Sequence, residues 1–462
     1  MVNNMELDKI GQLILSKDLE TALMDVKMGI EVEMHRVFKN GKLSNHGFPE
    51  ELGEQEKNRR IKNDFFNMQS EIITPTAANA AEAIRDLTAL NYSLRSALKE
   101  DEVLWPLSLP PILPENLNTL EISHVSPEKE KYYHEWLSKH DIRRALPTGV
   151  HVNLSFDSAL INSLYAYVRN DYTDKSAIRN ALFEKVTHGF IKYSWLLTYL
   201  FGATPISEQN FYVGSVPDYP VRSLRGSREY GLFSDFRGNY SSIHDYEKAI
   251  LVAIDSEEIQ SESEFHGPIR LKSLKGLKGM AQNGVDYMEL RMLDLDPTSS
   301  IGIRSSTVRF IRLLVMYFVM NEDDWQESDQ LKAEKMNEKV ALEPAQSMTG
   351  YQNEAINMMN NLQNFVKSIG LSVNMQRTLN ELNQRVINPS ITLSAQLCNE
   401  IEDNSLIKYA ISRAEMYQNG ALQDQRRVYK KSLDGQDVTD DELQEILFDQ
   451  DWQHIEYPKN IS

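Results

Sequence analysis

Three short stretches of the chain alternate apolar and polar residues, which is the two-residue period of a β-strand with one buried face. They are residues 28–37, 150–156 and 285–295. Two longer stretches, 78–98 and 307–320, have the length and apolar content of helices, and the second is apolar enough to be buried. These patterns predict a mixed protein in which short strands pack between helices.

The predicted elements fall into three regions. The first, residues 1–125, begins with an amphipathic helix and continues into a strand, and the second, residues 126–305, mixes helices with strands. The third, residues 305–462, reads as almost entirely helical, and Thr439 with Glu442 fits the capping box of its last helix.

Charge and composition narrow the class of protein. The chain has 462 residues, of which 67 are acidic and 49 basic, and its formal net charge is −18. A hydrophobic content of 41 % supplies enough surface for a core and excludes a disordered chain. The acidity argues against a nucleic-acid partner and favours divalent cations wherever carboxylates converge.

The cysteine count and the apolar runs bear on location. Cys398 is the single cysteine, so no internal disulfide can form, and its simplest role is that of a small buried apolar residue. The run from Phe310 to Met320 is too short to cross a membrane and contains Arg312. The first residues lack the pattern of a signal peptide. We therefore expect a cytoplasmic protein that contacts no membrane.

Polar residues share one face of each predicted strand. Glu31 and Glu33 alternate with apolar residues, so both carboxylates share a face and lie about 7 Å apart by strand rise. Taken singly, such a pattern is more typical of an ordinary half-exposed strand than of a site. The other two strands present polar faces of the same kind, formed by His151, Asn153 and Ser155 and by Tyr287, Glu289 and Arg291.

Asp64 and Glu71 flank a further short run. Their odd spacing places them on opposite faces of a straight strand, so both can face one site only if the chain turns between them. If all these faces converge, five carboxylates and His151 share one site, and cations are needed to keep so many carboxylates ionised. Oxygen-rich coordination of this kind suits Mg²⁺ or Mn²⁺.

Ten sequence blocks in the first two regions follow one another in the order of a known family. With them the chain resembles the bacterial glutamate–cysteine ligases, which are glutamine-synthetase-like carboxylate–amine ligases. The blocks are GIEVEMHRV (29–37), LSNHGFP (43–49), DFFNMQSEIITP (64–75), WPLSLPP (105–111), YYHEWL (132–137), TGVHVNLSF (148–156), YLFGATP (199–205), SLRGS (223–227), EFHGPIR (264–270) and DYMELRMLDLDPTSSIGI (286–303).

The resemblance implies a fold and a domain plan. The fold is α+β, with a curved antiparallel sheet that forms a funnel, ATP entering at one end and amino acids at the other. Residues 1–305 are then the catalytic core that carries every matched block. Residues 306–462 are a mainly helical region packed on that core, in what is expected to be one structural unit.

The resemblance also implies a role for particular residues. The metal ligands, for two or three Mg²⁺ or Mn²⁺ ions, fall on Glu31, Glu33, Asp64, Glu71, His151 and Glu289. The contacts to ATP fall on Arg291, Asn153 and Arg270, with Arg291 and Glu289 as the catalytic residues. The contacts to the amino-acid substrates fall on Arg225, Phe65, Tyr133, Tyr230 and His266.

The implied reaction is the first step of glutathione biosynthesis. ATP phosphorylates the γ-carboxylate of L-glutamate, and the amine of L-cysteine attacks the resulting acyl phosphate. Such chemistry needs charge neutralisation and alignment more than a protein nucleophile. Because the sequence ends at residue 462 without the ATP-grasp extension of fused relatives, the expected product is γ-glutamylcysteine and not glutathione.

One departure from the family pattern leaves an alternative open. His266 stands where the family block N-E-[LF]-Y-x-P-I-R usually has Tyr, so the chain could instead be a γ-glutamyl ligase for a different amine. A metal-binding relative without catalysis is disfavoured, because all six ligand positions and Arg291 are present. The oligomeric state stays open, and a monomer is compatible with the sequence.

Overall fold

A computed structural model describes residues 7–231 and 236–432 of the chain. Its strands form one sheet in the order β2-β3-β1-β5-β7-β6, with β4 paired to the far end of β1. The strands are β1 (Lys27–Phe38), β2 (Ile61–Asn63), β3 (Gln69–Ile73), β4 (Glu102–Leu104), β5 (Val150–Ser155), β6 (Ile269–Lys272) and β7 (Tyr287–Leu293).

Every pairing described in this sheet is antiparallel. The long strand β1 lies in the middle, where Glu33 pairs with Glu71 of β3 and Glu31 pairs with His151 of β5. The prediction of an α+β protein built on an antiparallel sheet is confirmed, as are strands at all three alternating stretches.

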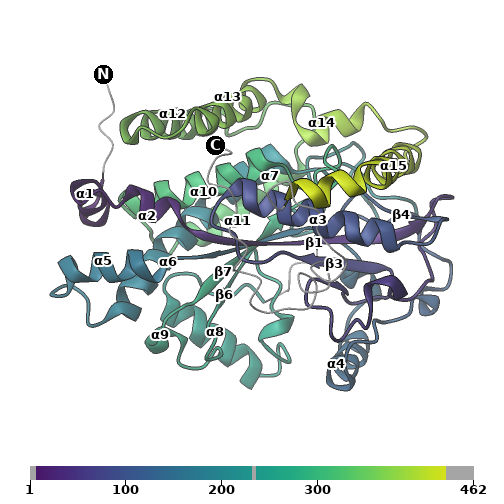
Figure 1. The fold of residues 1–462 in the computed structure, drawn as a ribbon, viewed down its shortest axis with the longest axis horizontal. Coiled ribbons are helices and arrows are strands. Elements are labelled where there is room, and N and C mark those ends of the chain that lie inside the picture. The colour runs from purple at the N-terminus through teal and green to yellow at the C-terminus, as the bar shows by residue number, and fades with distance from the viewer. Residues whose placement is uncertain (1–6, 232–235, 433–462) are drawn as a thin grey trace.

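Helices cover both sides of the sheet. Figure 1 shows α3, α10, α12 and α13 on one side and α4, α8 and α9 on the other. The helices before residue 300 are α1 (Lys9–Ser16), α2 (Glu20–Met24), α3 (Ala80–Ala97), α4 (Pro127–Leu137), α5 (Ser158–Val168), α6 (Lys175–Lys192), α7 (Ser194–Phe201), α8 (Ile243–Asp255) and α9 (Met280–Asn283). Those after it are α10 (Ser305–Met320), α11 (Asp329–Leu342), α12 (Gln352–Ile369), α13 (Val373–Ile387), α14 (Leu393–Cys398) and α15 (Ile407–Ser432).

Short 3₁₀ turns complete the connections. They are η1 (Glu50–Leu52), η2 (Leu117–Thr119), η3 (Ile142–Ala145), η4 (Glu262–Glu264) and η5 (Pro389–Ile391). Among the described residues, no helix combines the length and hydropathy that a transmembrane span requires.

One hydrophobic core joins the sheet to the helices that follow it in sequence. The apolar face of β1, which includes Ile30 and Val32, is fully buried in the same core as Phe310 and Ile311 of α10. The guanidinium of Arg312, also on α10, donates to the backbone carbonyl of Val26 at 2.9 Å and so fastens this helix to the start of β1. The division into a catalytic core and a helical region near residue 305 stays a prediction, and the capping box at Thr439 and Glu442 lies outside the described residues.

Candidate functional site

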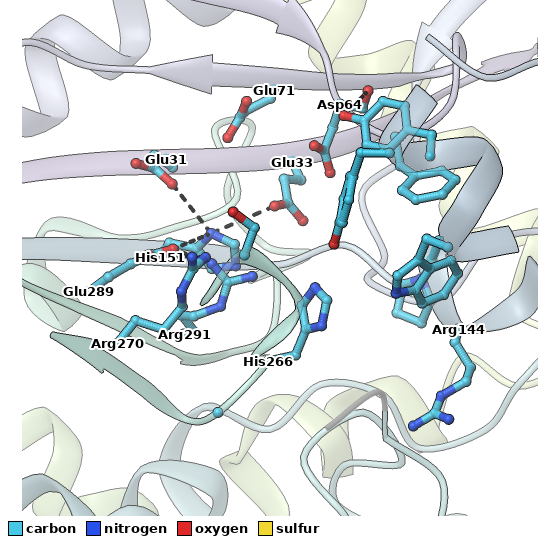
Figure 2. A pocket seen from close by; sticks show the side chains of 18 of the residues that line it. Glu31, Glu33, Asp64, Glu71, Arg144, His151, His266, Arg270, Glu289 and Arg291 are labelled. Carbon is cyan, nitrogen blue, oxygen red and sulfur yellow. Dashed lines mark hydrogen bonds and ion pairs between the residues drawn. The ribbon is translucent and has the colours of Figure 1, made fainter. Parts of the chain in front are cut away.

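A pocket of about 360 Å³ opens on one face of the sheet. Strands β1, β3, β5, β6 and β7 contribute side chains to it, and α4 and the turn after β2 close one end (Figure 2). The lining residues are Glu31, Glu33, Asp64, Phe65, Glu71, Lys129, Tyr132, Tyr133, Trp136, Arg144, Ala145, Pro147, His151, Arg225, Ser263, His266, Gly267, Arg270, Lys272, Glu289 and Arg291.

One wall of the pocket is acidic because of the period of β1. Glu31 and Glu33 point into the pocket, while Ile30, Val32 and Met34 point into the core and are at most 1 % exposed. Alternation along one strand therefore supplies both a buried apolar face and two carboxylates on the opposite face.

The turn that the sequence required between Asp64 and Glu71 is present. β2 ends before Asp64, and the backbone N–H of Asp64 donates to the carbonyl of Gln69, where β3 begins, at 2.8 Å. The side-chain amide oxygen of Gln69 accepts from the backbone N–H of Phe66 at 3.1 Å and holds the turn from inside. Both carboxylates consequently reach the pocket, where with Glu31 and Glu33 they form what we call the acidic wall.

Three side chains on neighbouring strands lie close enough to hold one metal ion. Ligand atoms of Glu31, His151 and Glu289 all lie within 4.8 Å of one another. The Nδ1 atom of His151 is 3.4 Å from Oε2 of Glu31, 3.5 Å from Oε1 of Glu289 and 3.6 Å from Oε1 of Glu33. The side-chain amide of Asn153 donates to Oε1 of Glu31 at 2.7 Å, which orients that carboxylate. A nitrogen and several carboxylate oxygens at this spacing fit a hard divalent cation.

The electrostatics of the acidic wall also fit cations. Burial and the negative charges of Asp64, Glu31 and Glu33 raise the pKa of Glu71 well above its ordinary value. Burial likewise raises the pKa of Glu33, although His151 opposes that shift. These carboxylates are thus costly to ionise together in the protein alone, and a bound cation removes that cost.

The opposite wall of the pocket is basic. We call Arg270 and Lys272 on β6, together with Arg291 on β7, the basic wall. Arg291 forms a close ion pair with Oε1 of Glu289, and Nη1 of Arg270 lies 3.7 Å from Oε2 of the same glutamate. Burial of Glu289 favours its neutral form, but Arg291, His151 and Arg270 outweigh it and lower the pKa of this carboxyl to about 2. Glu289 therefore stays ionised, with Arg291 and Arg270 on one side and His151 on the other.

Arg225 enters the pocket from a loop and is held by the backbone of β7. Its Nη1 donates to the carbonyl of Leu293 at 3.0 Å and its Nη2 to the carbonyl of Arg291 at 3.2 Å. Nη1 also lies 3.4 Å from Oδ1 of the buried Asp294. A Cβ atom on Gly149 would lie 2.1 Å from Nη2 of this guanidinium and 2.9 Å from the carbonyl oxygen of Leu293, so a larger residue there requires Arg225 and the neighbouring strand to move.

Aromatic side chains close the end of the pocket beside Asp64. The aromatic end consists of Phe65 with Tyr133 and Trp136 of α4, and the ring centroids of Phe65 lie 4.3 Å and 5.3 Å from those two rings. Ser126 caps the start of α4 by accepting from the N–H of Lys129, and Tyr133 and Trp136 of this helix line the pocket. The hydroxyl of Tyr133 donates to the carbonyl of Asp64 at 3.3 Å.

Of the residues to which the family resemblance gave a role, all line this pocket except Asn153 and Tyr230. Asn153 contacts Glu31 but does not line the pocket, and Tyr230 packs against Tyr212 outside it, at 5.4 Å between ring centroids. Cys398, expected to be buried, is only half-buried at the end of α14, and burial raises the pKa of its thiol to about 11.

The pocket also contains polar and aromatic residues to which the sequence analysis gave no role. Three of them could have been found from the sequence. Tyr132 and Trp136 belong to a matched block, and Lys272 lies two residues after Arg270, which puts both on the same face of a strand. Lys129 and Arg144 gave no such signal, because only the packing of α4 and η3 brings them to the sheet. The unassigned residues are Lys129, Tyr132, Trp136, Arg144, Ser263 and Lys272.

Comparison with known proteins defines the class. The family model described as glutamate-cysteine ligase matches residues 12–231 and 230–341 of this chain. These matches cover more than half of the sequence, and the chain belongs to the glutamate–cysteine ligase family.

Individual relatives agree with this assignment. The glutathione biosynthesis bifunctional protein of Lactiplantibacillus plantarum is 32 % identical over 428 residues, covering 90 % of this chain and 55 % of the relative. The protein of the same description from Streptococcus thermophilus is 31 % identical, covering 98 % of this chain and 62 % of the relative. The chain thus spans somewhat more than half the length of these curated relatives.

Solved structures share the fold. A bifunctional glutathione synthetase from Pasteurella multocida superposes with a TM-score of 0.84 at 25 % identity, over 92 % of this chain and 56 % of that one. A glutamate–cysteine ligase from Francisella tularensis, solved with AMP, superposes with a TM-score of 0.77 at 21 % identity, over 88 % and 91 % of the two chains.

Proposed function

We propose that this chain joins the γ-carboxylate of L-glutamate to the amine of L-cysteine at the expense of ATP, giving γ-glutamylcysteine, ADP and phosphate. The observation that carries the proposal is the separation of charge in one pocket. Four carboxylates line one wall, three cations line the other, and Glu289 and His151 lie between them. This arrangement suits a polyphosphate that is held by metal ions on one side and by cations on the other.

The protein groups would act as follows. Two or three Mg²⁺ or Mn²⁺ ions would be held by Glu31, Glu33, Asp64, Glu71, His151 and Glu289. This role is in keeping with the close spacing of Glu31, His151 and Glu289, which we call the metal-binding triad. When bound, the ions neutralise phosphate charge and align the oxygen atoms that react. Arg291 would contact the phosphoryl group in transfer, with Arg270 and Asn153 as the further nucleotide contacts of the family pattern.

The amino acids would bind at the aromatic end. Arg225, fixed by its contacts to β7, presents a cation to a substrate carboxylate. Phe65, Tyr133 and His266 would surround the acceptor, and Tyr230 would require a rearrangement to reach it. Burial and the nearby Arg291 and Arg270 lower the pKa of His266 to about 3, so its ring is neutral and can face an uncharged side chain such as a thiol.

The two steps balance without a protein nucleophile. The γ-phosphoryl group moves from ATP to an oxygen of the glutamate carboxylate, and ADP leaves. The cysteine nitrogen then attacks the acyl carbon, phosphate leaves with the carboxylate oxygen, and the nitrogen loses a proton. The dependence of this reaction on ATP suits a cytoplasmic enzyme.

A second candidate differs only in the acceptor. His266 lines the pocket in place of the Tyr usual in its block, which favours a γ-glutamyl ligase for another amine. Coupled release of ADP should be measured with glutamate, Mg²⁺ and a panel of amines. Best turnover with cysteine supports the first proposal, and equal or better turnover with 2-aminobutyrate or another amine supports the second. ADP release that does not depend on glutamate would overturn both.

A further inference from the structure

The basic wall continues beyond the last carboxylate of the pocket. On β6, Arg270 and Lys272 share one face because they are two residues apart. In the pairing with β7, Arg270 is opposite Glu289 and Lys272 is opposite Tyr287. Lys272 therefore lies one strand repeat further along the pocket than Glu289, at the end away from Arg291.

The acidic wall stops before this point. The face of β1 that carries Glu33 and Glu31 continues with Gly29, which has no side chain and pairs with Asn153 of β5. The pocket consequently has two unlike ends. Aromatic rings and Asp64 close one, whereas the other, which we call the open end, has Gly29 on the β1 side and Lys272 on the β6 side.

Lys272 is held at this rim by a contact that a ligand can replace. Its Nζ lies 2.5 Å from Oε1 of Glu262 in η4, and the two side chains are 22 % and 23 % exposed. Nη2 of Arg270 is 3.5 Å from the backbone carbonyl of the same glutamate. A partly exposed ion pair contributes little to stability, and a phosphoryl oxygen is at least as good a partner for an ammonium group as a carboxylate.

We propose that Lys272 binds the α- or β-phosphoryl group of the nucleotide and exchanges Glu262 for a phosphoryl oxygen when the nucleotide enters. This proposal rests on the proposed function and adds a direction to it. The phosphate chain runs from Lys272 past Arg270 to Arg291, with the adenosine at the open end. The amino acids then occupy the aromatic end.

The ion pair between Lys272 and Glu262 can be broken by changing either residue. Comparing the two changes distinguishes a loss of nucleotide binding from a loss of local structure. Binding of ADP in the presence of Mg²⁺ should be measured by calorimetry for the full chain and for Lys272→Gln, Lys272→Arg and Glu262→Gln. We expect Lys272→Gln to weaken ADP binding about tenfold or more, because it removes a charge-assisted contact. Lys272→Arg should retain most of the affinity, and Glu262→Gln should bind ADP at least as tightly as the unaltered chain. The KM for glutamate should be the same in all four proteins.

The alternatives give different results. If the ion pair serves only to hold η4 on β6, Lys272→Gln and Glu262→Gln weaken ADP binding equally, and the proposal is overturned. It is also overturned if Lys272→Gln binds ADP as well as the unaltered chain does. Lys272→Met, which keeps the apolar stem, replaces Lys272→Gln if the latter melts early. Failure of the unaltered chain to bind ADP with Mg²⁺ would instead overturn the proposed function.

Discussion

Nε2 of His140 lies 2.7 Å from Oε1 of Glu264, and this contact ties the two sides of the pocket together. His140 follows α4 and packs against Trp136 of the aromatic end, with 4.6 Å between the centroids of the two tilted rings. Glu264 is buried and lies two residues before His266. The aromatic rings and His266 are thereby held at a fixed distance by a pair of residues that do not themselves line the pocket.

Breaking this tie should affect acceptor binding more than chemistry. We expect His140→Phe, which keeps the ring but not the hydrogen bond, to raise the KM for the acceptor about 3- to 10-fold with little change in kcat. His140→Gln should recover part of the loss. A double-mutant cycle with Glu264→Gln checks the coupling, and independent, additive effects of the two changes would contradict the tie.

Glu289→Gln tests the metal site directly. The substitution keeps the shape of the side chain but removes the negative charge that Arg291 contacts and that a metal ion would need. Turnover of ATP should therefore fall about 100-fold or more. Mn²⁺ affinity, followed by electron paramagnetic resonance, should fall with it. Glu258→Gln, an exposed change outside the pocket, is the matched control. Unchanged ATP turnover in Glu289→Gln would refute the assignment of the site.

The acidic wall predicts a stability that depends on both pH and metal. Glu33 and Glu71 have raised pKa values, so these two carboxyls bind more protons in the folded protein than in the unfolded chain at pH values above their ordinary 4.5. Their contribution to the stability of the metal-free protein is therefore lost as pH rises above 4.5. Metal binding needs the ionised carboxylates, so the increase in Tm on adding Mg²⁺ should be larger near pH 8 than near pH 5.5. A shift in Tm that shrinks with rising pH would contradict this account.

Gly149→Ala should weaken amino-acid binding without replacing a charged residue. Its Cβ would lie 2.1 Å from Nη2 of Arg225, so the guanidinium must leave its two carbonyl partners or the strand must move. We expect a loss of about 1–3 kcal/mol of stability and a marked rise in the KM for an amino-acid substrate. Gly47→Ala is the control, because its Cβ would meet nothing within 4 Å. Equal effects of the two alanines would argue against a positioning role for Gly149.

The shared core predicts that residues 1–305 do not fold without the helices that follow. A fragment ending there would expose the surface that Phe310 and Ile311 cover and would lose the contact of Arg312 with Val26. Circular dichroism should show no cooperative thermal transition for the fragment. Co-expression with residues 306–462 should restore one, whereas a cooperative transition in the fragment alone would establish an independent domain.

The sequence predicted the parts of the fold that depend on local periodicity. The alternation around Glu31 and Glu33 correctly placed both residues on one face of β1, because a strand buried on one side leaves that signature. The odd spacing of Asp64 and Glu71 correctly required a turn. The order of strands in the sheet depends on contacts far apart in sequence, and no local pattern specifies it.

The residues of the site were likewise predictable only where local spacing or a matched block indicated them. Glu31, Glu33 and His151 were found because spacing along an alternating strand indicates their face, but Lys272 on the short strand β6 was missed. Lys129 and Arg144 depend on how α4 and η3 dock against the sheet. Tyr230 was assigned from the family pattern alone, and the structure places it against Tyr212. Side chains that reach the pocket from loops and helices, such as Arg225 and Tyr133, are thus assigned only through the family pattern, because no local spacing indicates where they point.

The two faces of β1 have a consequence for how this gene can change. Because side chains alternate strictly along a strand, one residue inserted into or deleted from β1 ahead of Glu31 would exchange the faces, and the carboxylates would enter the core while Ile30 and Val32 entered the pocket. Substitutions in β1 can be absorbed one at a time, but a change in its length cannot. Length variation among relatives of this chain should therefore lie in the loops, and β1 should keep the same number of residues wherever the activity is kept.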